Sequence, residues 1–90
     1  MNEDEARSLL ARRLRFLLML PYEELVERFL DRSEASEALG PSGTRYRVEL
    51  SGRWEDPVTR RLRVRGSIED GEGGRLVARF SAAPGDLDPR

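Results

Sequence analysis

The 90-residue sequence contains no cysteine, histidine or lysine, and these absences narrow the chemistry open to it. Without cysteine the chain forms no disulfide bond and offers no thiolate to a metal, which is compatible with a reducing cytoplasm. Histidine, lysine and cysteine are also the residues that most often act as general bases and nucleophiles near neutral pH. We therefore expect a protein that is not an enzyme and that uses no cofactor or metal ion.

Long apolar runs are also missing. The longest, residues 16–21, is much shorter than the roughly 20 residues that a membrane-spanning helix needs. Three of the first five residues are acidic and none is basic, unlike the basic start of a secretory signal, so we expect a cytoplasmic protein with no membrane partner. Because a chain of this length builds only a small core, a second copy would help it to bury apolar surface.

The beginning of the chain carries the signals of a helix. Asn2 and Glu5 have the spacing of an N-terminal cap, and the acidic residues between them suit the positive end of a helix. The apolar side chains that follow cover about 200° of a helical wheel, more than the stripe of about 100° that covers one sheet. Pro21 predicts a kink or break and then a second helix, which we expect to fade towards Leu39 before the turn at residues 40–43.

A different period begins at residue 44. Apolar residues, glycine and threonine occupy most even positions, and arginine recurs at odd positions, which is typical of strands with one buried face. Short turns separate three such strands, at about residues 44–54, 58–68 and 75–82, so the connections predict antiparallel hairpins. The even-numbered residues expected to point inward are Tyr46, Val48, Leu50, Trp54, Val58, Leu62, Val64, Ile68, Leu76, Ala78, Phe80 and Ala82.

Together these patterns predict an α+β fold. An N-terminal helix with a proline kink or break leads into a second helix, and both pack on one face of a three-stranded antiparallel β-meander. We expect a single domain over residues 1–82 and a flexible C-terminal tail over residues 83–90, where proline, glycine and aspartate are frequent.

The odd-numbered face of the sheet is the candidate partner-binding face. Its arginines are Arg45, Arg47, Arg53, Arg61, Arg63, Arg65, Arg75 and Arg79. Guanidinium groups neutralise phosphates. One hypothesis is therefore that this face binds nucleic acid or another polyanion. In the alternative without a ligand, the arginines are solvated and cover the sheet with their aliphatic stems. Acidic residues at the rim would then pair with nearby arginines, but Arg47, Arg63 and Arg79 at the centre of the face would remain short of anions.

Self-association is the leading hypothesis, because the first helix is too apolar to be covered by one sheet. The candidate dimer helix carries Leu10, Leu14, Phe16, Leu17 and Leu18. Acidic residues expected on the helical layer would meet the basic face of another subunit, and that face would equally suit an acidic partner protein. These acidic residues are Glu23, Glu24, Glu27, Asp31, Glu34 and Glu37.

Residues 18–71 resemble a group of short bacterial proteins of unknown function that combine N-terminal helices with a three-stranded meander. The residues that carry the resemblance are Leu20, Pro21, Tyr22, Leu25, Gly43, Thr44, Tyr46, Val48, Glu49, Trp54, Asp56, Leu62, Arg63, Val64, Gly66, Ser67, Ile68, Asp70 and Gly71. The resemblance implies turn and core positions for these residues and implies no function.

Overall fold

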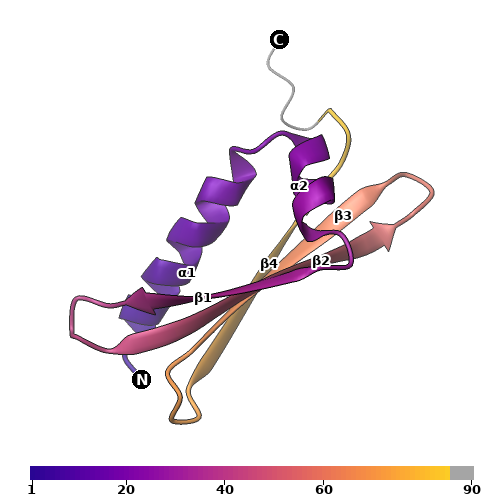
Figure 1. Cartoon of the computed structure of the whole chain (residues 1–90). Coiled ribbons are helices and arrows are strands. Elements are labelled where there is room, and N and C mark those ends of the chain that lie inside the picture. The colour runs from indigo at the N-terminus through magenta and orange to yellow at the C-terminus, as the bar shows by residue number, and fades with distance from the viewer. Residues whose placement is uncertain (86–90) are drawn as a thin grey trace.

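The computed structural model describes residues 1–85 and shows two helices followed by four strands (Figure 1). The elements are α1 (Glu3–Leu18), α2 (Tyr22–Phe29), β1 (Ser33–Leu39), β2 (Arg45–Asp56), β3 (Arg61–Glu69) and β4 (Arg75–Ala82). The strands form one antiparallel sheet in the order β1-β2-β3-β4, which confirms the α+β class. Most of the tail predicted at residues 83–90 lies outside the described residues, and the domain boundary stays a prediction.

The two helices cover one face of the sheet, with α1 packed on β3 and β4 and α2 packed on β2. Asn2 caps α1, since its side chain accepts a hydrogen bond of 3.1 Å from the backbone N–H of Glu5. The helix ends at Leu18, and Pro21 is the N-cap of α2, so the predicted break is confirmed. Within residues 1–85, neither helix has the length and apolar character needed to cross a bilayer.

The prediction of three strands and of a second helix fading towards Leu39 is wrong, because residues 33–39 form the edge strand β1. Asp31 stops the helix in a left-handed conformation, with φ of 54°, and its N–H donates to the carbonyl oxygen of Gly52 at 2.9 Å. The chain then pairs with β2, where Glu37 lies opposite Arg47. Satisfying the open backbone edge of β2 outweighs the helical preference of the alanine, glutamate and leucine in this segment.

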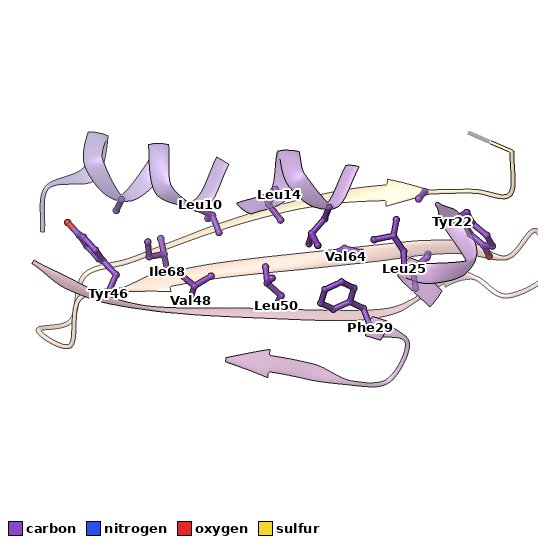
Figure 2. Close-up of a cluster of buried hydrophobic side chains, with 14 residues drawn as sticks. Leu10, Leu14, Tyr22, Leu25, Phe29, Tyr46, Val48, Leu50, Val64 and Ile68 are labelled. Atoms are coloured by element: carbon purple, nitrogen blue, oxygen red, sulfur yellow. The ribbon is translucent and has the colours of Figure 1, made fainter. Parts of the chain in front are cut away.

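The core lies between the helices and the even-numbered face of the sheet, as the alternation predicts. Tyr46, Val48 and Val64 are buried, and Figure 2 shows them with Leu10 and Leu14 of α1 above the strands. The whole cluster is Ala6, Leu10, Leu14, Leu17, Tyr22, Leu25, Phe29, Tyr46, Val48, Leu50, Leu62, Val64, Ile68 and Ala82. Leu76, Ala78 and Phe80 on β4 are only half-buried, because β4 is the last strand of the sheet.

Val58 is an exception, since it was expected inward but is 89% exposed. The reason is that β2 continues to Asp56 and β3 begins at Arg61, which leaves residues 57–60 as the turn. The Asp56 carboxylate accepts a hydrogen bond of 3.0 Å from the backbone N–H of Val58, which stabilises that turn. Tyr22 at the start of α2 donates its hydroxyl to the carbonyl oxygen of Arg60, so the same turn is anchored to the helical layer.

The N-terminal end of α1 is fastened to the β1–β2 turn by Glu5. Its carboxylate accepts hydrogen bonds from the backbone N–H of Ser42 at 2.8 Å, from the Ser42 hydroxyl at 2.7 Å and from the Tyr46 hydroxyl at 2.7 Å. The backbone hydrogen bond from Ser42, followed by the two hydroxyl bonds, lowers the pKa of Glu5 below its ordinary value. The hydrogen bond to Glu5 raises the pKa of Tyr46, because it favours the protonated phenol.

Candidate functional site

All eight arginines predicted for the candidate partner-binding face lie on the outer face of the sheet, away from the helices. The half of this face nearest the β1–β2 turn is balanced in charge. Arg47 lies between Glu37 of β1 and Glu69 of β3, and Arg75 lies on the far side of Glu69. Arg47 is also 3.7 Å from the Glu49 carboxylate, so opposite charges alternate across all four strands.

The other half of the outer face is strongly basic. Arg53 of β2 lies directly opposite Arg63 of β3, and Arg65 of β3 lies directly opposite Arg79 of β4. We call these four residues the arginine cluster. Like charges in directly opposed positions destabilise a sheet unless an anion compensates them.

Glu55 supplies part of that compensation. Its carboxylate accepts hydrogen bonds from Arg61 at 2.9 Å, from Arg63 at 2.5 Å and from the Ser81 hydroxyl at 2.9 Å. The hydrogen bond from Arg63, followed by that from Ser81, lowers the pKa of Glu55. Within residues 1–85, the guanidinium groups of Arg53, Arg65 and Arg79 form no ion pair or hydrogen bond.

The arginine cluster surrounds a depression of about 410 Å³. Ser51 and Gly52 of β2 contribute to its lining, together with the four arginines. Among the three arginines expected to lack anions, Arg47 and Arg63 have carboxylate partners, so the basic region is centred further along the sheet than the sequence indicates. Register decides this, because it places Arg53 and Arg65 beside Arg63 and Arg79.

A second surface runs along the free edge of β4. We call it the α1–β4 groove, a depression of about 530 Å³ between the helix and this edge strand. Its apolar lining comes from both elements, and arginines stand at its rim. The lining residues are Arg7, Leu10, Ala11, Leu14, Arg15, Leu18, Leu76, Val77, Ala78, Arg79 and Phe80.

The two edges of the sheet differ in how they are protected. Along β1 the side chains are small or charged except for Leu39 at its end, which is 66% exposed, and of the seven residues only Ala38 is partly buried. In β4 the inward-facing Leu76, Ala78 and Phe80 are apolar and half-buried, and the strand pairs on one side only. Charged residues on an edge discourage pairing with another chain, whereas an apolar edge invites it.

The residues of the candidate dimer helix divide into two groups. Leu10, Leu14 and Leu17 belong to the core of a single chain. Phe16 is 59% exposed and Leu18 is 40% exposed, and of these two only Leu18 lines the α1–β4 groove. The wide apolar arc of this helix therefore covers the sheet with its middle and leaves apolar side chains at its C-terminal end.

The acidic residues expected on one helical layer are dispersed. Glu23, Glu24 and Glu27 are exposed on α2, but Glu34 and Glu37 lie on β1 because the second helix is shorter than predicted. No group of three or more acidic side chains in residues 1–85 is arranged to hold a metal ion.

The comparisons with known proteins return nothing: no protein-family model matches the chain, and no curated protein or solved structure is significantly similar to it.

Proposed function

We propose that the protein is a cytoplasmic, non-enzymatic association domain whose partner is a second copy of itself, joined along the free edge of β4. The observation that carries this proposal is the α1–β4 groove, where an open strand edge adjoins half-buried apolar side chains. One added strand would form hydrogen bonds with the backbone groups on such an edge and would bury the apolar surface beside it.

The inner face of β4 is complementary to itself. In an antiparallel pair of β4 strands related by a two-fold axis at Ala78, Leu76 of each copy lies opposite Phe80 of the other. Both side chains are half-buried in a single chain and would become covered in the pair. The apolar residues of the two copies thus meet without a polar residue between them.

The outer face of β4 selects the same register. With the axis at Ala78, Arg79 lies opposite Val77, and Arg75 lies opposite Ser81. An axis at Val77 would oppose Arg75 to Arg79, and an axis at Arg79 would oppose that residue to itself. Because directly opposed like charges are unfavourable, the register centred on Ala78 is preferred over these two registers.

The helix contributes to the same junction. Leu18 and Ala11 line the groove beside β4. The α1 helices of two copies would therefore lie on the same face of the joined sheet and flank the junction between the two β4 strands. Leu18 would lose exposed apolar surface, while Arg7 and Arg15 at the rim would keep their charged ends in water. This arrangement retains the first helix as part of the dimer and adds the strand edge to it.

The test is the molar mass in solution, measured by light scattering after size exclusion at micromolar concentration. We expect twice the 10.3 kDa mass of one chain. Val77→Arg would place an arginine opposite Arg79 at two symmetry-related positions. At about 0.2 to 1 kcal/mol for each pair, this weakens the dimer by roughly 2- to 30-fold.

Two further variants make the test specific to the register. Val77→Glu introduces a charge as Val77→Arg does, but it places a carboxylate opposite Arg79 and should therefore tighten the dimer. Val58→Arg, at a turn position far more exposed, is the matched control and should leave the mass unchanged. A wild-type protein that remains at the mass of one chain would refute the proposal, as would equal effects of the two Val77 variants.

A further inference from the structure

The positive charges of the arginine cluster are only partly compensated by the described residues. Two arginine pairs face each other across neighbouring strands, Arg53 with Arg63 and Arg65 with Arg79. Glu55 is engaged with Arg63 and with Arg61, and it lies at one end of the group. An anion placed between the two pairs would relieve the repulsion of both.

We propose that the arginine cluster is a binding site for a compact ligand that carries several linked phosphate groups, such as a tripolyphosphate chain. This inference goes beyond the proposed self-association and does not depend on it, because all four arginines come from one chain. The ligand would bind the outer face of the sheet, whereas the second copy of the chain would bind at the free edge of β4.

The spacing of the four positions suits such a ligand. Neighbouring strands are about 4.8 Å apart, and residues two apart on one strand are separated by about 7 Å, so the four positions form a small parallelogram across β2, β3 and β4. The depression of about 410 Å³ lies between its members. A planar guanidinium group can donate two parallel hydrogen bonds to one phosphate, and several such groups can converge on linked phosphates.

The surroundings of the cluster limit the length of the ligand. Glu55 lies at one end, and Glu49 and Glu69 lie on the same face beyond the other end. A long nucleic acid would have to pass over these carboxylates, which would repel its phosphates. The strand residues described on this face also include no aromatic side chain on which a base could stack. These features favour a short phosphate chain over a nucleic acid.

Charge density separates linked phosphates from an acidic peptide. The cluster concentrates four positive charges on three adjacent strands, with only one carboxylate bonded to it among residues 1–85. Linked phosphates place several negative charges within a few ångströms, whereas a peptide distributes its carboxylates on flexible side chains. Flexible side chains lose more conformational entropy when they are held in place.

The experiment is isothermal titration calorimetry of the full chain with sodium tripolyphosphate, at two salt concentrations. We expect one tripolyphosphate per chain, with an affinity at least tenfold higher than for orthophosphate and lower at the higher salt concentration. Replacing Arg65 and Arg79 together by serine should weaken binding at least tenfold. The matched control replaces Arg45 and Arg47 by serine, which removes the same charge from the balanced half of this face and should change the affinity less than twofold.

Further probes separate the sources of the phosphate chain and the competing ligands. If ATP competes as strongly as inorganic tripolyphosphate, the site accepts the phosphate chain of a nucleotide. If ATP competes more weakly, the site prefers an inorganic phosphate chain. Three results would overturn the proposal: no tripolyphosphate binding, tighter binding of a single-stranded oligonucleotide or of an oligoglutamate peptide, or equal losses in the two double variants. Circular dichroism of each variant shows that it is folded.

Discussion

The contact between α2 and β2 at Gly52 leads to a sharp prediction about stability. A Cβ atom added at Gly52 would lie 2.9 Å from both the Cβ atom and the carbonyl oxygen of Phe29. These atoms belong to or adjoin the backbone, so they cannot move aside as the end of a side chain can. The same backbone is held in place by the bridge between Leu30 and Gly52 and by the hydrogen bond from Asp31 to the Gly52 carbonyl.

The expected cost of Gly52→Ala follows from two opposing terms. Overpacking a tight contact destabilises a protein by about 1–3 kcal/mol. Replacing glycine by alanine returns about 0.4–1 kcal/mol, because the unfolded chain has fewer conformations to lose. From the mid-range values of the two terms, the net loss in the free energy of unfolding is about 1.3 kcal/mol. For a domain of this size, each kcal/mol lowers the melting temperature by about 4–8 °C.

Gly66→Ala is the matched control on the neighbouring strand. Its added Cβ atom would meet methyl groups of Leu10, Leu50 and Leu14 at 3.0 to 3.2 Å, and these side-chain ends can shift. We expect a change within about 1 kcal/mol for this variant. Thermal and urea unfolding followed by circular dichroism measures both. If Gly52→Ala is as stable as the wild type, or if Gly66→Ala is the more damaging change, the close approach of α2 to β2 is not rigid as argued.

Further predictions concern the Glu5 hydrogen bonds and the β2–β3 turn. The pKa of Glu5 is lowered in the folded state from its ordinary value of 4.5, so its contribution to stability is present above about pH 4.5 and is lost as the pH falls through the folded-state pKa. Glu5→Gln should therefore lose less stability than the wild type between about pH 5 and pH 2 in urea unfolding, and an equal loss in the two proteins would contradict this role of Glu5. Leu62→Ala should cost about 2–5 kcal/mol because Leu62 is fully buried, whereas Val58→Ala should change the free energy of unfolding by less than about 0.5 kcal/mol. Equal melting temperatures for these two variants would contradict the placement of residues 57–60 in a turn.

Local patterns in the sequence account for most of the fold. The cap at Asn2, the break before Pro21 and the alternation over three strands each depend on neighbouring residues, and the structure confirms them. The strand β1 could not be predicted in this way, because residues 33–39 contain no β-branched or aromatic residue. They become a strand only because β2 presents an unpaired edge beside them, which is a tertiary effect.

The candidate sites show the same division. Strand parity correctly places the eight arginines on the outer face. It does not indicate which of them are neighbours across strands, since that depends on register and on the length of each turn. The turn at residues 57–60 and the β-bulge between Trp54 and Asp56 together bring Arg63 opposite Arg53. The α1–β4 groove could not be predicted either, because the sequence alone does not show which strands lie at the edges of the sheet.

The order of the elements also affects how the chain is made on the ribosome. Every pair of adjacent strands is joined by a short turn, so each hairpin can form as soon as its second strand emerges. By contrast, α1 is synthesised first, and it packs on β3 and β4, which are synthesised last. At about 5–20 residues per second, its leucine stripe stays uncovered for some seconds during translation. A nascent chain stalled before β3 would expose that stripe, and we expect it to be a good substrate for cellular chaperones.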